Sequence, residues 1–114
     1  MPNRADQLDR VFHALADPTR RTVLQRLSAG TAPVSELARP FQMALPSFLQ
    51  HLKVLEGCGL VRSRKAGRVR TYQITPRPLK AAEGWIAGQR LMWERRLAQL
   101  DHYLGELKLP KGQE

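Results

Sequence analysis

Five basic side chains crowd into nine residues of the chain, at Arg62, Arg64, Lys65, Arg68 and Arg70. Like charges at this density repel one another, so the segment loses stability unless negative charge lies alongside it. Guanidinium and ammonium groups bind phosphate oxygens well, Arg through a planar fork of N–H donors and Lys as a compact charge. The cluster therefore predicts a phosphate-binding segment, and a solvated charged loop is the alternative.

The overall charge favours the phosphate-binding interpretation. Nineteen basic residues against ten acidic ones give the 114-residue chain a formal charge of +9 and an isoelectric point near 10.8. Clustered positive charge binds nucleic acid because it releases the counterions condensed on the phosphates, whereas a scattered excess does little. Nucleic acid is therefore the leading predicted partner.

Length and composition predict one folded domain over residues 1–114, with an ordered core at 6–108. A content of 42% hydrophobic and 25% charged residues is typical of a folded chain rather than a disordered one. No apolar run is long enough to cross a bilayer, and the N-terminus lacks the pattern of a secretion signal. We therefore expect a cytoplasmic protein that has no membrane partner.

Hydrophobic periodicity predicts four short helices before the basic cluster. Asp17 and Pro18 mark the start of the second helix, since aspartate caps free N–H groups and proline fits the first turn. Gly57 and Gly59 mark the end of the fourth. The predicted helices are residues 6–16, 18–27, 34–38 and 46–58.

The basic cluster itself is predicted to lie on a β-hairpin. Residues 60–63 and 69–75 are short β-prone runs, and 65–68 between them has the composition of a turn. Near-heptad apolar spacing then predicts a long C-terminal helix at 78–108. The predicted fold class is mainly α with a small β-hairpin.

Four segments in this order, LADPTRRTVLQRL, VSELA, LPSFLQHLKVLEGCGLV and RSRKAGRVRTYQIT, resemble the ArsR (arsenic-repressor) family of small bacterial transcription regulators. The resemblance covers residues 7–107. It implies a winged helix-turn-helix that forms a two-fold homodimer and binds double-stranded DNA at an inverted repeat. A repressor is favoured over an activator because an occupied operator blocks polymerase without further contacts.

The resemblance makes residues 46–58 the recognition helix, whose first turns enter the major groove. Ser47, Gln50 and His51 are then the candidates for base or phosphate contact, because each side chain offers both a donor and an acceptor. Lys53, with its charge on a long stem, suits a phosphate.

Each of the base-reading candidates also has a structural alternative. Ser47 can satisfy the helix N-terminus, Gln50 can simply be solvated, and His51 can be a partly buried residue bonded to a neighbouring backbone. Ala44 and Leu49 are apolar where similar family members often carry small polar residues. Leu49 can touch a thymine methyl group or face inward, so no operator sequence follows.

In the same resemblance the basic cluster becomes the wing, which reaches phosphates or the minor groove beside the recognition helix. Strand alternation turns some of its side chains away from the DNA. The last helix is expected to form a dimer interface, since it carries more apolar surface than a small domain easily hides. The resemblance implies that it pairs with the first helix and with its copy in the partner. The interface candidates are Leu8, Phe12, Trp85, Trp93, Leu97, Leu100 and Leu104. Closing the protomer's own core is their alternative role.

No cofactor and no metal are expected. Thiolate-sensing members of the family carry a Cys-x-Cys-type box where this chain reads SELARPF, and His13, His51 and His102 lie in separate segments. Cys58, the only cysteine, is predicted to be a small hydrophobe near the core, because a redox switch needs a resolving partner. An effector stays unidentified.

Two other classes of function compete with the regulator. The sequence has no nucleophile elbow, phosphate-binding glycine loop, H-E-x-x-H motif or paired carboxylates, so an enzyme is not expected. A general nucleic-acid-binding protein that reads no sequence is the stronger rival, because it would use the same basic surface. A specific regulator prefers its operator to random duplex by orders of magnitude, and this preference separates the two.

Overall fold

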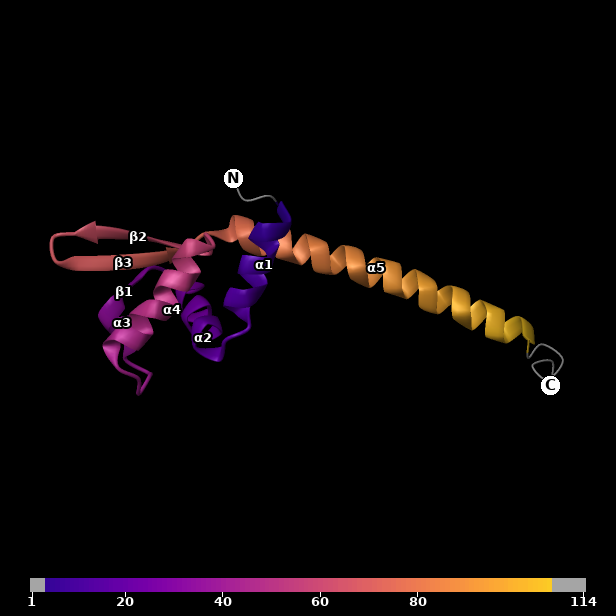
Figure 1. Ribbon diagram of the computed structural model, residues 1–114, viewed down its shortest axis with the longest axis horizontal. Helices are drawn as coiled ribbons and strands as arrows, with labels where there is room; N and C mark the ends of the chain where they lie inside the picture. The colour runs from indigo at the N-terminus through magenta and orange to yellow at the C-terminus, as the bar shows by residue number, and fades with distance from the viewer. Residues whose placement is uncertain (1–3, 108–114) are drawn as a thin grey trace. The chain divides into compact units, whose positions relative to one another are not determined.

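Figure 1 shows the computed structural model of the protein, which describes residues 4–107. The described part is mainly helical and contains one small antiparallel sheet, so the predicted fold class is confirmed. The elements are α1 (Arg4–Leu15), α2 (Pro18–Leu27), β1 (Ala32–Pro33), α3 (Val34–Ala38), α4 (Leu45–Gly57), β2 (Val61–Ala66), β3 (Val69–Ile74) and α5 (Pro76–Leu107).

Local sequence signals place the helix ends. The Asp17 side chain accepts a hydrogen bond of 3.0 Å from the Arg20 backbone N–H and so caps α2, whose first residue is Pro18. The last helix begins at Pro76, two residues before the predicted start. Proline is tolerated there because the N–H groups of the first turn have no partner within the helix. The predicted end at residue 108 lies outside the described residues.

The sheet has the strand order β1-β3-β2, and the sequence analysis missed its first strand. This strand has only two residues, and Ala32 pairs with Tyr72 across the sheet. The predicted hairpin is present as β2 and β3, with Gly67 in the turn at a φ of 64°, a left-handed conformation that glycine adopts without steric cost.

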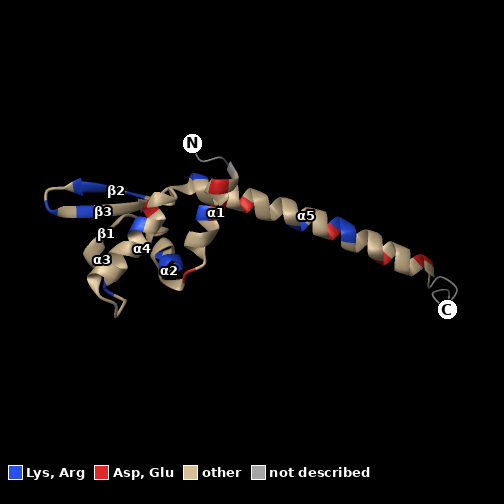
Figure 2. Cartoon of the chain, in the orientation of Figure 1, with Lys and Arg blue, Asp and Glu red and all other residues tan. Residues whose placement is uncertain are grey.

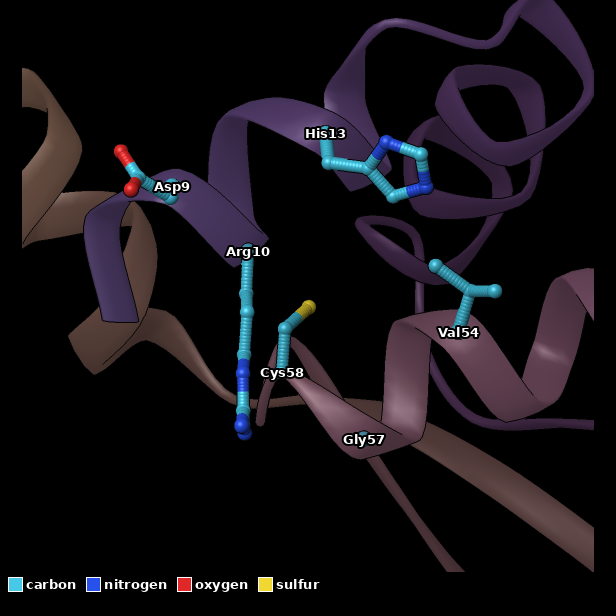
Figure 3. Close-up of a pocket in the computed structure, with 6 residues that line it drawn as sticks. All are labelled: Asp9, Arg10, His13, Val54, Gly57 and Cys58. Carbon is cyan, nitrogen blue, oxygen red and sulfur yellow. The ribbon is translucent and has the colours of Figure 1, made fainter. Parts of the chain in front are cut away.

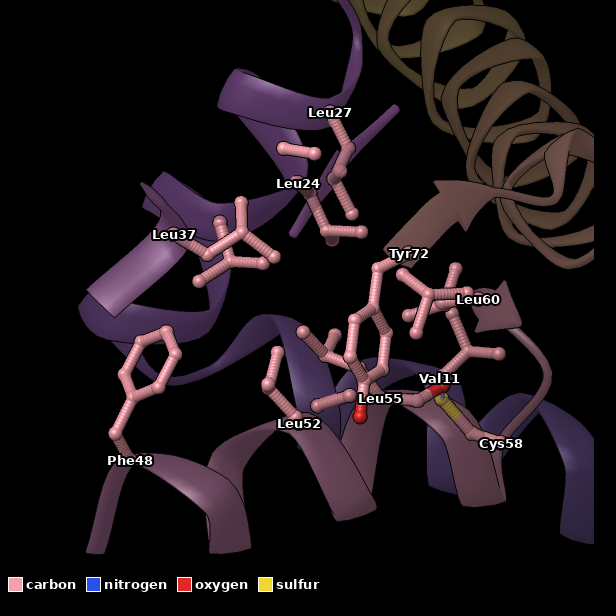
Figure 4. Packing of buried hydrophobic residues seen from close by; sticks show 14 of the residues in the cluster. Val11, Leu24, Leu27, Leu37, Phe48, Leu52, Leu55, Cys58, Leu60 and Tyr72 are labelled. Carbon is pink, nitrogen blue, oxygen red and sulfur yellow. Dashed lines mark hydrogen bonds between the residues drawn. The ribbon is translucent and has the colours of Figure 1, made fainter. Parts of the chain in front are cut away.

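A hydrophobic core holds α1 to α4 against the sheet (Figure 4). The α4 helix turns one face inward, and its Phe48, Leu52 and Leu55 are almost fully buried. Leu37 of α3 and Tyr72 of β3 are buried in the same core. The turn between α3 and α4 is held by Phe41, whose ring centroid lies 5.4 Å from that of Phe48. The inward face of α4 thus determines which side chains point outward.

The chain divides into two compact units, residues 1–82 and 83–114. The first unit contains α1 to α4, the sheet and the first turns of α5, where Pro78 and Ala82 are buried. The rest of α5, to Leu107, is the described part of the second unit. The single domain inferred from chain length stays a prediction.

Candidate nucleic-acid interface

The outward face of α4 carries three of the four polar residues that the sequence singles out on this helix. Ser47, Gln50 and Lys53 are exposed, on the side of the helix away from the buried Phe48, Leu52 and Leu55. Leu49 is 39% exposed and therefore does not face inward. The exposed face of α4 thus presents a hydroxyl, an amide, an ammonium and one apolar group to a ligand.

His51 differs from these neighbours because its imidazole is partly buried and contacts another side chain of the protein. Its side chain is 22% exposed, and Nδ1 lies 3.0 Å from an Nη1 atom of Arg20 and 3.7 Å from a carboxylate oxygen of Asp17. The alternative inferred from the sequence was a bond to a neighbouring backbone. The structure instead pairs His51 with a side chain 31 residues earlier in the chain.

Arg20 is a functional candidate that sequence reasoning missed. It is 8% exposed, and its guanidinium donates to the backbone oxygens of Ala14 (2.9 Å) and His13 (3.1 Å) as well as contacting His51. These bonds connect the end of α1 to α4. A signal was available, because Arg20 falls at helical spacing with the buried Val23, Leu24 and Leu27.

Asp17 completes this cluster at the start of α2. Burial acts to raise the pKa of the Asp17 carboxyl, whereas the hydrogen bond from the Arg20 backbone N–H and the positive charge of Arg20 act to lower it. The net effect is a pKa below the ordinary value of 3.8. Asp17 therefore holds negative charge beside the His51–Arg20 pair.

The register of the hairpin distributes the basic side chains over two faces. Residues directly opposite in an antiparallel pair share a face, and successive residues alternate. Lys65 and Arg70 are opposite one another and share a face with the paired Ser63 and Tyr72. Arg62 and Arg64 occupy the other face, where they pair with Gln73 and Thr71.

All five basic side chains of the hairpin, Arg62, Arg64, Lys65, Arg68 and Arg70, are exposed, and Figure 2 shows the basic colour on both strands and at the tip. No acidic side chain in residues 4–107 forms a salt bridge with any of them. The positive charge of the hairpin is therefore open to an external anion.

A short chain of hydrogen bonds links the hairpin to α4. The Ser63 hydroxyl donates to a carboxylate oxygen of Glu56 on α4 at 2.8 Å, and Arg70 donates to the same hydroxyl at 2.7 Å. The face that carries Lys65 and Arg70 is therefore the one joined to α4. On the other face, Arg62 faces the Gln73 amide. With the amide oxygen turned toward Arg62, this oxygen accepts hydrogen bonds from Arg62 Nε at 2.9 Å and from Nη2 at 3.0 Å.

The interface candidates fall in both units. Leu8 and Phe12 are half-buried against the core of the first unit. In the second unit, α5 exposes large apolar side chains along its length. The exposed fractions are 50% for Trp85, 66% for Trp93, 59% for Leu97, 51% for Leu100 and 39% for Leu104. Leu91, Met92 and Tyr103 are exposed as well and were missed, because they fall off the near-heptad spacing.

A pocket of about 450 Å³ lies between α1 and the end of α4. It is lined by six residues, which Figure 3 shows: Asp9, Arg10, His13, Val54, Gly57 and Cys58. The Cys58 thiol is buried and donates to the Leu55 backbone oxygen at 3.3 Å. Burial raises the pKa of this thiol, which disfavours the reactive thiolate. The prediction that Cys58 is a buried small hydrophobe is confirmed.

Between residues 4 and 107, no three or more His, Cys, Asp or Glu side chains are grouped closely enough to hold a metal ion. None of the helices in the same range combines the length and hydrophobicity that spanning a membrane requires.

A helix-turn-helix with an exposed polar face on its second helix, followed by a basic hairpin, defines a winged helix-turn-helix DNA-binding protein. Residues 15–64 match the family model of a helix-turn-helix domain. The transcriptional regulator Rv2034 of Mycobacterium tuberculosis is 48% identical over 73 residues, which cover 64% of this chain and 68% of Rv2034. The transcriptional repressor SdpR of Bacillus subtilis is 28% identical over 69% of this chain and 88% of its own.

Similar solved structures belong to the same class of protein as these relatives. The ArsR family transcriptional regulator RHA00566 is 55% identical, with a TM-score of 0.77 over 82% of this chain and 97% of its own. The homodimeric winged helix-turn-helix DNA-binding domain of Mb0332 from Mycobacterium bovis is 30% identical, with a TM-score of 0.60 over 80% of this chain and 82% of its own. The chain belongs to the ArsR family of transcription regulators.

Proposed function

We propose that the protein represses transcription as a homodimer that binds an inverted-repeat operator. The observation that carries this proposal is the exposed polar face of α4 together with a basic hairpin hydrogen-bonded to the same helix through Ser63 and Glu56. SdpR, a similar protein, is a transcriptional repressor, and the similar domain of Mb0332 is homodimeric. Both likenesses support the proposal for this chain.

In the proposed complex, the first turns of α4 lie in the major groove. Gln50 is exposed and can pair bidentately with adenine, and Ser47 can bond to a base edge or a phosphate. Lys53 binds a phosphate, and Leu49 can contact a thymine methyl group. The opposite face of α4 stays in the core, so these contacts leave the fold unchanged.

The hairpin positions the DNA in this proposal. Lys65 and Arg70 lie on the face joined to α4, whereas Arg62 and Arg64 lie on the opposite face. A hairpin with basic groups on both faces and Arg68 near its tip can bind phosphates on both sides of a minor groove. Such contacts give affinity and register, and base contacts from α4 supply the specificity.

The second copy of the chain is proposed to cover the apolar residues of α5. Trp93, Leu97, Leu100 and Leu104 follow one another at spacings of four, three and four residues, as in the seam between two packed helices. A row of this kind left in water is unusual for a stable monomer. Leu8 and Phe12 are partly buried in the core and contribute through the portions that remain exposed.

The proposal includes cytoplasmic localisation, since a bacterial transcription regulator acts where the chromosome lies. It includes no catalytic activity, which is supported by membership of a family of regulators. A general nucleic-acid-binding role is the competing proposal, because the basic hairpin alone would bind any duplex.

Selection of bound duplexes from a random pool, with purified protein near physiological salt, tests the proposed function. Parallel samples contain a chelator or added divalent metal. We expect an inverted repeat to be enriched in both samples, and in-vitro transcription from a promoter that contains it to fall as protein is added. Absence of any enriched motif would favour the general nucleic-acid-binding role, and enrichment in only one sample would show that metal controls binding.

A further inference from the structure

We propose that Arg20 is a positioning residue for DNA recognition, which holds His51 in a single tautomer so that Nε2–H donates to an acceptor on the DNA. The proposal rests on the proposed function, because it assigns one contact within that complex. Arg20 need not touch the DNA to have this role. It acts through the imidazole of His51 on the recognition helix.

The hydrogen bond between the two side chains determines the tautomer. A guanidinium has only N–H donors and stays protonated, so it cannot accept a hydrogen bond. The His51 Nδ1 atom lies 3.0 Å from the Arg20 Nη1 and accepts in this bond, since the Asp17 carboxylate oxygen, at 3.7 Å, is beyond hydrogen-bond distance of Nδ1. An imidazole that accepts at Nδ1 is neutral and carries its proton on Nε2, which leaves Nε2–H as a donor.

The remaining nitrogen of His51 is open to a ligand. Nε2 forms no hydrogen bond to any residue between 4 and 107, and this part of the chain contains no buried side-chain nitrogen or oxygen that lacks a partner. Nε2 is therefore not fully buried and reaches solvent. His51 lies on the same helix as the exposed Gln50 and Lys53, so a DNA that contacts these residues comes close to it.

The surroundings of Arg20 keep it in place. Two further bonds from its guanidinium go to the backbone oxygens of Ala14 and His13 at the end of α1, at 2.9 and 3.1 Å. Because Arg20 is buried and held at three points, its orientation toward His51 does not depend on the DNA. The donor is thus set before binding, which lowers the entropy lost when the contact forms.

The acceptor on the DNA is a phosphate oxygen or a purine N7 or O6, since each of these accepts from an N–H group. A phosphate contact would affect all duplexes alike. A purine contact would change the preference among sequences. Binding to a panel of duplexes with single base changes distinguishes the two.

The tautomer is measured first, by long-range ¹H–¹⁵N correlation spectra of the histidine side chains without DNA at pH 8, where an ordinary imidazole is neutral. We expect His51 to show only the Nε2–H form, and the exposed His13 to show averaged signals. An Nδ1–H form or a mixture at His51 in the wild-type protein would overturn the proposal.

The contact between His51 and the DNA is tested next, by measuring the DNA affinity of three His51 variants. Each variant is first shown to unfold at the same temperature as the wild type. Glutamine places an amide N–H near the position of Nε2, whereas asparagine places one near Nδ1. We expect H51Q to bind within about twofold of the wild type, and H51N and H51A to bind about five- to tenfold more weakly, the effect of one hydrogen bond. Equal binding by all three, or tighter binding by H51N than by H51Q, would refute the contact.

An Arg20→Met variant completes the test. It removes the donors to His51, so we expect the His51 spectrum to become a mixture of tautomers and the affinity to fall in proportion to the fraction of His51 that leaves the Nε2–H form, a smaller loss than that of H51A. If the variant does not fold, the spectra and the His51 series still decide the question. Failure to select an operator would reject the proposed function alone, because the tautomer and the binding to random duplex remain measurable.

Discussion

Removal of two wing charges should weaken DNA binding and reduce its dependence on salt. Arg68 and Arg70 are exposed and form no salt bridge within residues 4–107, so their alanine variants disturb no ion pair in the fold. Each phosphate contact contributes about −0.9 to the slope of log affinity against log salt concentration. Loss of two contacts should therefore flatten this slope by about 1.8.

The expected change is large enough to measure by titration of a fluorescent duplex. Between 50 and 200 mM salt, each phosphate contact accounts for a factor of about 3.5 in affinity, so two account for about twelve. Over this salt range, the affinity of the wild type should therefore fall by a factor at least about twelve times larger than that of the double variant. It should bind operator and random duplex more weakly by a similar factor, because phosphates carry no sequence information.

A matched control removes the same charge from another part of the chain. Arg95 and Arg96 are exposed on the part of α5 that belongs to the second unit. Their double alanine variant lowers the net charge equally but should leave the slope nearly unchanged. The wing has no role in binding if Arg68→Ala/Arg70→Ala keeps the wild-type slope and affinity. The effect is one of net charge alone if both double variants change the slope equally.

Three further predictions concern specificity, assembly and stability. Gln50→Ala should change the ranking of duplexes in a selection experiment because it removes a bidentate base contact, and an unchanged ranking would exclude Gln50 as a reader. Trp93→Ala combined with Leu97→Ala should shift the protein from dimer to monomer in sedimentation, whereas an unchanged mass would place the dimer contact elsewhere. Asp17→Ala should lower the free energy of unfolding in urea by about 1 kcal/mol at pH 7, the value of a helix cap. Because folding lowers the pKa of Asp17 below 3.8, this stabilisation is present above the ordinary carboxyl range and is lost as the pH falls below it; a difference that stayed constant down to pH 2 would contradict the capping role.

Much of the first unit follows from local signals. The aspartate and proline at 17 and 18 start α2, and the apolar periodicity of residues 46–58 places Phe48, Leu52 and Leu55 inward. With that face inward, the outward position of Gln50 and Lys53 follows from helix geometry. The hairpin was equally readable, because β-prone runs flank a turn.

Local sequence patterns could not predict which residues pair when they lie far apart in the chain. The strand at Ala32 and Pro33 is too short to carry a pattern. It exists only because β3 offers an open edge, where Pro33 pairs with Thr71, 38 residues further on, and Ala32 with Tyr72, 40 residues further on. The division of basic groups between two faces depended on register, which fixes Lys65 opposite Arg70.

The sequence by itself determined the helices, the inward face of α4 and the basic hairpin, because these depend on periodicity, capping and charge within a few residues. Only the tertiary structure brought Arg20 to His51, since their bond joins residues 31 positions apart and needs α1, α2 and α4 to be packed first. A buried arginine is tolerated there because backbone oxygens at the end of α1 and the imidazole satisfy its donors. Such satisfaction of a buried charge is a property of the packed core, which local sequence does not encode.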